Sequence, residues 1–101
     1  MPTLTPGQRA YLRREAHDLN PIVQIGKQGL TDEVIRSTEQ VLYNRELIKV
    51  KFLDFKDQKQ ELSEQLAEAV HGSLVAVIGN IAILYRENPD PDKREIVLPW
   101  G

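Results

Sequence analysis

The sequence predicts an α/β fold with the element order α-β-α-β-α-β-β, in which a four-stranded mixed sheet is packed with helices. Three observations support this prediction. Three segments carry apolar residues at helical spacing, short apolar or alternating runs separate them, and a Gly-Asn pair divides the last apolar stretch. The 101 residues suit a single domain over residues 1–101, with a core of about residues 4–88.

The first predicted helix is TPGQRAYLRREAHDL, residues 5–19. Thr5 is expected to cap its N-terminus, Pro6 fits the first helical position, and Gln8 completes a capping box. The helix is expected to end before Pro21, because a residue that precedes proline disfavours the helical region.

The next elements form a strand–helix–strand unit. The strand PIVQI (residues 21–25) is followed by the helix LTDEVIRSTEQVLYN (residues 30–44) and the strand ELIKVKFLD (residues 46–54). Thr31 is a suitable N-cap for the helix, and Asn44 is a suitable left-handed residue to end it. Such units connect parallel strands with a right-handed crossover.

A third helix and a hairpin complete the core. The helix DQKQELSEQLAEAVHG (residues 57–72) is expected to end at Gly72. Gly79-Asn80 predicts a tight antiparallel turn between two strands. Residues 81–85 are apolar almost without alternation, so this strand is expected at the centre of the sheet. Residues 89–101 form a loop and then a short edge strand or a loosely held tail.

Composition restricts the function. The chain has no cysteine, which excludes disulfides and thiol nucleophiles and fits a reducing compartment. No apolar run approaches the roughly 20 residues of a membrane span, and the N-terminus has no signal core. We therefore expect a cytoplasmic monomer that does not bind membranes.

The charge also restricts the function. The net charge of −2 argues against a strongly basic nucleic-acid binder. The charge is unevenly placed, however. Residues 1–60 hold 10 Lys and Arg against 8 Asp and Glu, whereas residues 61–101 hold 3 against 7. A local basic face is compatible with this distribution, and so is random scatter.

The sequence offers no convincing catalytic or metal site. His17 and His71 are the only histidines. His71 fits a helix C-terminus, where a cation is favourable. Three glutamates of the third helix, at positions 61, 64 and 68, fit a solvated acidic face. We therefore expect a protein that is not an enzyme and that needs no metal or cofactor.

The segment Gly26-Lys27-Gln28-Gly29 stands between a strand and a helix. It is too short for a P-loop and does not match the dinucleotide fingerprint. One interpretation is a plain strand-to-helix turn. The other is a phosphate-binding loop, because it opens onto a helix N-terminus, Lys27 supplies a cation, and KH domains use a G-x-x-G loop to hold a nucleotide backbone.

Further basic residues are candidates for the same face. Arg9, Arg13 and His17 recur every fourth residue of the first helix, Arg14 lies beside them, and Arg86 follows the last strand. Ordinary solvated surface is the alternative interpretation for these arginines. Tyr85 is interpreted as a packing residue rather than as a surface for stacking bases.

With these elements identified, the sequence closely resembles the YhbY family of RNA-binding proteins, which are stand-alone bacterial versions of the CRM domain (chloroplast RNA splicing and ribosome maturation). The matching segments are YLRREAHDLNPIVQIGKQGLT (residues 11–31), ELIKVKF (residues 46–52) and VIGNIAILYR (residues 77–86). The resemblance covers the chain from about residue 4 to residue 99. One departure is Asn80, where the family often carries Lys or Arg.

The resemblance implies the α-β-α-β-α-β-β topology and a fold similar to the C-terminal domain of bacterial translation initiation factor three. It also implies RNA binding, association with precursors of the large ribosomal subunit, and a role in ribosome maturation. The family's G-x-x-G loop falls on Gly26, Lys27, Gln28 and Gly29. Its basic positions fall on Arg13 or Arg14 and on Arg86.

Two functions are therefore predicted. The first is a single-domain RNA-binding protein that assists assembly of the large ribosomal subunit by holding ribosomal RNA through its backbone, since the basic face lacks interleaved aromatic residues. The alternative is a protein-interaction adaptor that docks through an exposed sheet edge or through the apolar tail IVLPW, residues 96–100.

Overall fold

The protein has three α-helices and four strands in the predicted order, as seen in a computed structural model that describes residues 3–99. The helices are α1 (Pro6–Glu15), α2 (Asp32–Arg45) and α3 (Lys59–Ala69). The strands are β1 (Pro21–Ile25), β2 (Leu47–Phe52), β3 (Ser73–Ile78) and β4 (Ile81–Tyr85). Short 3-10 helices span Lys56–Gln58 and Pro91–Lys93. The predicted α/β class is confirmed.

The four strands form one mixed sheet in the order β1-β2-β4-β3. β1 and β2 are parallel, whereas β4 is antiparallel to both of its neighbours. The predicted hairpin joins β3 to β4 through Gly79, which has a φ of +57°. β4 lies inside the sheet and four of its five residues are buried, which confirms the central position predicted from its apolar run.

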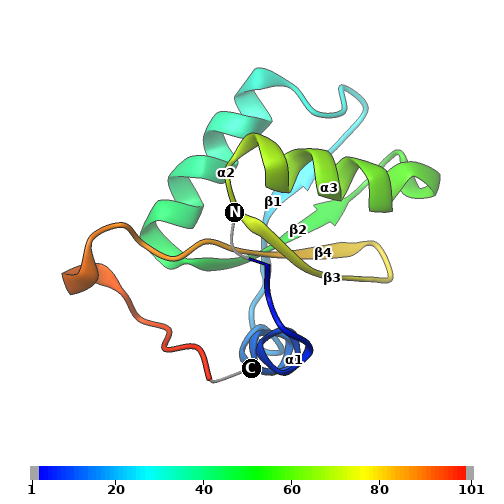
Figure 1. Ribbon diagram of the computed structural model, residues 1–101. Helices are drawn as coiled ribbons and strands as arrows, with labels where there is room; N and C mark the ends of the chain where they lie inside the picture. The colour runs from blue at the N-terminus through cyan, green and yellow to red at the C-terminus, as the bar shows by residue number, and fades with distance from the viewer. Residues whose placement is uncertain (1–2, 100–101) are drawn as a thin grey trace.

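Helices cover both faces of the sheet (Figure 1). α2 and α3 lie on one face, where they enclose a first apolar cluster that includes Ile25, Leu42, Val50, Phe52 and Leu66. α1 lies on the opposite face. There a second, smaller cluster forms from Leu4, Leu12, Ala16, Leu47, Val75, Ile83 and Tyr85. Strand alternation explains the division, because successive side chains of a strand point to opposite faces.

The helix starts follow the predicted capping chemistry. The Thr5 hydroxyl accepts from the Gln8 N–H at 3.1 Å, and the Gln8 side chain accepts from the Thr5 N–H at 3.1 Å. This is the predicted capping box. At α2, the Thr31 hydroxyl accepts from the Val34 N–H at 3.1 Å.

The helix ends differ from the prediction. Asn44 stays within α2, and Glu46 takes the positive φ of +63° that follows the helix. After α3, His71 rather than Gly72 has a positive φ, of +56°. Position 72 favours glycine because of close packing: a Cβ there would lie 3.2 Å from the carbonyl oxygen of Tyr85.

Glu46 also fixes the C-terminal segment. Its side chain is buried, and its carboxylate accepts from the N–H groups of Asn88 at 2.7 Å, Glu95 at 2.7 Å and Ile96 at 3.1 Å. Ile96 and Leu98 then pack against the second cluster. Up to residue 99 the segment is thus an anchored tail rather than an edge strand. Trp100, which ends the predicted apolar tail, lies outside the described residues.

Candidate nucleic-acid interface

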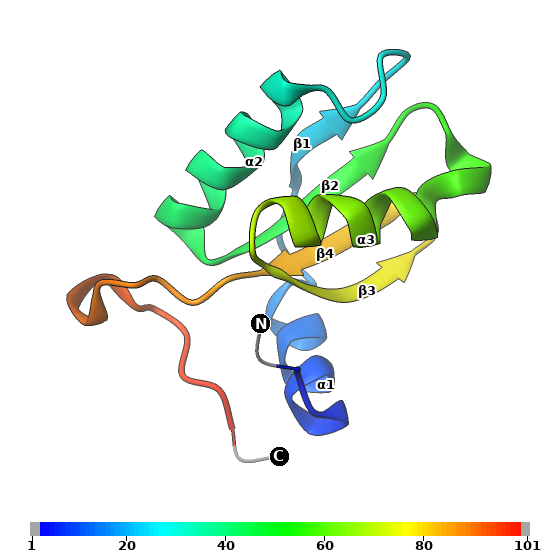
Figure 2. The same ribbon diagram turned by 45° about the horizontal axis from the view of Figure 1, so that its top comes forward.

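Three loops meet at one end of the sheet, along its right-hand edge in Figure 2. They are the loop after β1, the loop after β2 and the β3–β4 hairpin. The N–H groups of Leu53 and Asp54 donate to the carbonyl of Ile25 at 2.9 and 3.3 Å, and the Phe52 N–H donates to the Asn80 carbonyl at 2.8 Å. These bonds fix the loops relative to one another.

The loop after β1 is a closed turn whose two glycines serve different purposes. The Gly29 N–H donates to the Gly26 carbonyl at 3.0 Å, and Gly29 has a φ of +73°, which favours glycine. Gly26 has no positive φ, and a Cβ built there meets no atom within 4 Å. The folded chain therefore requires glycine at position 29 but not at position 26.

The tip of this turn is open to a ligand. Lys27 and Gln28 are both exposed, and within the described part of the chain their N–H groups donate to no protein acceptor. The ion pairs found between residues 3 and 99 involve Arg86 and Arg94, so Lys27 has none there. The turn thus offers a cation and two backbone donors to an anion.

The N-terminus of α2 contributes less to such a site than the sequence predicts. Thr31 already accepts from the Val34 N–H, and Asp32 and Glu33 stand in the first helical turn. Those carboxylates interact favourably with the helix dipole and repel a second anion. An anion is therefore better placed on the Gly26–Gly29 turn than on the helix end.

A second group of basic side chains lies on the α1 face of the sheet. Arg13, Arg14 and His17 are exposed, and they line a shallow depression of about 550 Å³ together with Ile78 at the end of β3. The Lys49 ammonium donates to the carbonyl of His17 at 3.2 Å, which ties this end of α1 to β2.

A row of side chains connects the two groups. Strand register places Gln24, Lys51, Ile81 and Ile78 side by side across all four strands. Their neighbours Ile25, Val50, Ala82 and Val77 pack in or against the first cluster, so by alternation the row faces the α1 side. Gln24 and Lys51 are exposed, and Ile78 is 53% exposed. We call these four residues the open row.

Sequence reasoning left Lys49 and Lys51 out of the candidate site. The alternation in residues 48–52 already indicates that these two lysines face away from the apolar side of β2. Whether the two lysines can contact RNA depends on how much of the sheet α1 leaves uncovered, and the sequence pattern does not specify this.

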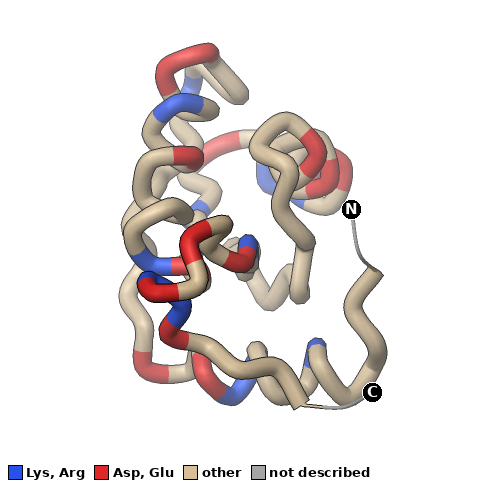
Figure 3. Tube along the Cα trace, turned by 60° about the vertical axis from the view of Figure 1, so that its left-hand side comes forward, with Lys and Arg blue, Asp and Glu red and all other residues tan. Residues whose placement is uncertain are grey.

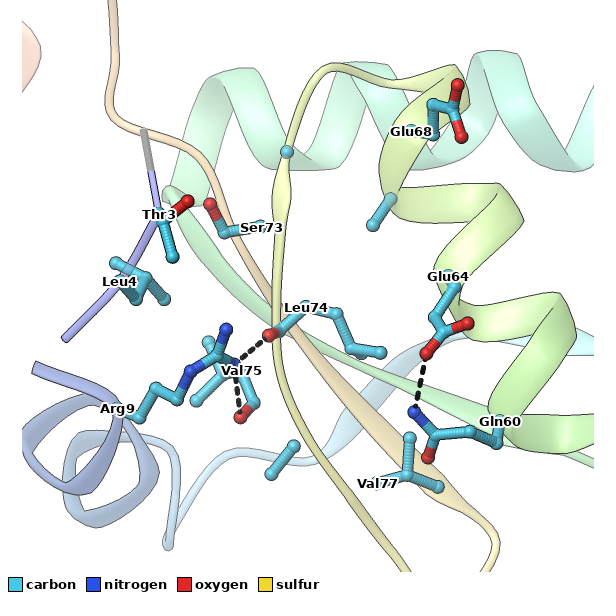
Figure 4. Close-up of a pocket in the computed structure, with 13 residues that line it drawn as sticks. Thr3, Leu4, Arg9, Gln60, Glu64, Glu68, Ser73, Leu74, Val75 and Val77 are labelled. Atoms are coloured by element: carbon cyan, nitrogen blue, oxygen red, sulfur yellow. Dashed lines mark hydrogen bonds between the residues drawn. The ribbon is translucent and has the colours of Figure 1, made fainter. Parts of the chain in front are cut away.

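Two of the predicted arginines are engaged within the protein. The Arg9 guanidinium donates to the carbonyls of Leu74 and Val75 on the outer edge of β3 (Figure 4). The Arg86 guanidinium donates to the Val70 carbonyl at 2.8 Å and lies 3.6 Å from the Glu39 carboxylate. The structure does not bring either of these side chains to the glycine turn.

Tyr85 is a packing residue, as interpreted from the sequence, because only 4% of it is exposed. Its hydroxyl is buried and has no hydrogen-bond partner among the described residues. Burial, reinforced by the negative charge of Glu46, raises the pKa of Tyr85 to about 12. The phenol is therefore neutral at physiological pH. Because the ring is buried, it is not accessible for stacking with an RNA base.

Acidic residues accompany the basic ones around much of the chain (Figure 3). α3 is the most acidic helix, with Glu61, Glu64 and Glu68 against Lys59. Within residues 3–99, no group of three or more His, Asp or Glu side chains is placed to hold a metal ion. No helix in the same range has the length and apolarity to cross a membrane.

The fold and the turn define a small α/β domain with an exposed cationic turn between a strand and a helix. Residues 4–86 match the model of the CRS1 / YhbY (CRM) domain, and the chain therefore belongs to this family. The family resemblance noted from the sequence is confirmed.

Relatives that match over nearly their whole length are named as RNA-binding proteins. The chain is 39% identical to the "Probable RNA-binding protein YqeI" of Bacillus subtilis, with 95% of this chain and 99% of the relative covered. It is 36% identical to an "RNA-binding protein" of Haemophilus influenzae, with 98% of each covered.

A solved structure supports the fold. The solution structure of the hypothetical protein SAV1595 from Staphylococcus aureus, described as a candidate RNA-binding protein, superposes with a TM-score of 0.79 at 45% identity. The match covers 96% of this chain and 100% of that one.

Proposed function

We propose that this protein binds the sugar–phosphate backbone of RNA and assists assembly of the large ribosomal subunit in the cytoplasm. It acts as a binding protein rather than as an enzyme. The Gly26–Gly29 turn holds one phosphate, with Lys27 as the nearest cation. The RNA then continues over Lys51 in the open row toward Arg13 and Arg14. The names of its relatives support RNA binding. The role in subunit assembly rests on the resemblance to the YhbY family noted from the sequence.

The observation that carries the proposal is Gly26. Neither its backbone conformation nor its packing needs a glycine, and a side chain there would project into open space. A missing side chain at such a position allows an external chain to approach the backbone closely. A sugar–phosphate chain fits, because Lys27 and the free N–H groups of the turn lie beside it.

The test reverses the charge of the turn. Lys27→Asp with Gln28→Asp keeps both glycines and changes the net charge by −3, because Lys→Asp contributes −2 and Gln→Asp −1. The matched control is Lys93→Asp with Gln40→Glu, which changes the net charge equally. Lys93 lies against the ring of Tyr43. Tyr43 is in the last turn of α2, at the end of that helix remote from the glycine turn.

We expect the turn variant to keep its circular dichroism spectrum and to bind RNA at least about tenfold more weakly, or about 1.4 kcal/mol. The control variant should bind within about twofold of the wild type. If the turn variant binds as tightly as the control, the turn takes no part in RNA binding.

The ribosomal role needs a separate measurement. The tagged protein should sediment with large-subunit precursors in cell extracts at low salt. It should leave them as salt rises, because phosphate contacts weaken steeply with ionic strength. Protein that stays at the top of the gradient at low salt would contradict the role in assembly. Retention on the particles at high salt would instead indicate docking on a protein.

A further inference from the structure

The loop that follows β2 exposes two apolar side chains. Leu53 is 45% exposed and Phe55 is 42% exposed, and neither belongs to the apolar clusters of the core. Phe55 also has a φ of +56° and a ψ of +37°, the left-handed conformation that bulky residues rarely adopt. An aromatic residue held in this way at the surface suggests a role outside packing.

Phe55 lies directly against the glycine turn. A Cβ at Gly29 would lie 3.6 Å from Cε2 and 3.9 Å from Cζ of the Phe55 ring. One edge of the ring therefore covers Gly29, and part of the ring remains open. The bonds from Leu53 and Asp54 to the Ile25 carbonyl, together with the 3.0 Å bond from the Gln58 N–H to the Phe55 carbonyl, hold the backbone of this loop beside the turn.

A shallow hollow of about 660 Å³ is lined by this loop and, from the glycine turn, by Lys27. Leu53 and Phe55 supply its apolar surface. Its charged lining residues are Lys27, Lys56, Asp54 and Asp57, whose formal charges cancel. Such a lining has no net charge to attract phosphate groups by itself. It does suit a nucleotide, which joins a flat apolar base with polar edges to a single phosphate.

We propose that Phe55 is a stacking platform for one unpaired base, next to the phosphate that the Gly26–Gly29 turn holds. This inference rests on the proposed function and specifies its substrate as single-stranded RNA. The bases of a duplex are stacked on one another and do not reach the ring. An aromatic face accepts any base, so the platform adds affinity with little sequence preference.

The test measures affinity by fluorescence anisotropy for a short unstructured oligoribonucleotide and for a blunt-ended RNA duplex without a loop. Phe55→Leu keeps an apolar side chain against Gly29 and removes the aromatic face, whereas Phe55→Trp keeps that face. Tyr43→Leu is the matched control, because it removes another exposed aromatic face in the last turn of α2, at the end of that helix remote from the glycine turn. Circular dichroism confirms the fold of each variant.

We expect Phe55→Leu to bind the single strand roughly tenfold more weakly than the wild type, in keeping with the loss of one stacked base. Its affinity for the duplex should not change. Phe55→Trp and Tyr43→Leu should both bind the single strand within about twofold of the wild type.

The failures of the two proposals are distinguishable. If Phe55→Leu binds the single strand like the wild type while Lys27→Asp with Gln28→Asp loses binding, the platform is refuted and the RNA-binding turn stands. An equal loss from Phe55→Leu and Tyr43→Leu would also refute the platform, because the loss would then not depend on an aromatic ring beside the glycine turn. If the wild type binds neither RNA, the proposed function itself is wrong.

Discussion

The two glycines of the turn after β1 should respond in opposite ways to substitution. Gly29 has a φ of +73°, and a left-handed conformation costs an ordinary residue about 1–2 kcal/mol. The added Cβ would lie 3.6 Å from the Phe55 ring, which is an ordinary contact and adds no clash. For a domain of this size, Gly29→Ala should therefore lower the melting temperature by roughly 4–16 °C.

Gly26→Ala should change stability by less than about 0.5 kcal/mol, because its side chain meets no atom within 4 Å and the backbone is unstrained. Its effect should instead be on RNA affinity. Gly26→Val, with a larger side chain in the path of the phosphate chain, should weaken binding by about tenfold or more.

Thermal denaturation by circular dichroism and RNA binding by anisotropy separate the two effects. Gly26→Ala is the internal control for Gly26→Val, since it adds a Cβ at the same position without the larger, branched side chain. The reasoning is refuted if Gly26→Val melts as low as Gly29→Ala. It is equally refuted if Gly26→Val binds RNA with wild-type affinity.

Two further predictions concern residues outside the turn. Arg13→Glu with Arg14→Glu should weaken RNA binding and leave the melting temperature nearly unchanged, because both side chains are solvated; an unchanged affinity in a filter-binding assay would remove α1 from the interface. Glu46→Ala should lower the free energy of unfolding by about 3 kcal/mol in urea titrations, because three N–H groups lose a charged acceptor. A loss below about 0.5 kcal/mol would show that water replaces the carboxylate.

Local chemistry made most of the fold predictable. The caps at Thr5 and Thr31 and the turn at Gly79 depend on residues only a few positions away. The central position of β4 follows from its unbroken apolar run, because a strand between two others in a covered sheet is buried on both faces.

The site was less predictable, because contacts between residues distant in sequence decide it. Arg9 resembles Arg13 in the sequence, yet its guanidinium finds the carbonyl of Val75, 66 residues away. Phe55 follows a strand and is predicted only as part of a loop, and its place beside Gly29, with one edge of its ring against that residue, follows from the fold. Glu46 has a charge that predicts exposure, and only the N–H groups of residues 88–96 explain its burial.

The second cluster has a consequence for synthesis, because it joins the two ends of the chain. Leu12 and Ala16 of α1 leave the ribosome early, whereas their partners Val75, Ile83 and Ile96 leave it late. A ten-residue helix is marginal in water without a partner, so α1 has no fixed place until β3 and β4 exist. The loops around the glycine turn also wait for this part of the chain, because the Phe52 N–H donates to the carbonyl of Asn80 between β3 and β4. The surface that would carry RNA across the sheet is completed only when β4 has been made.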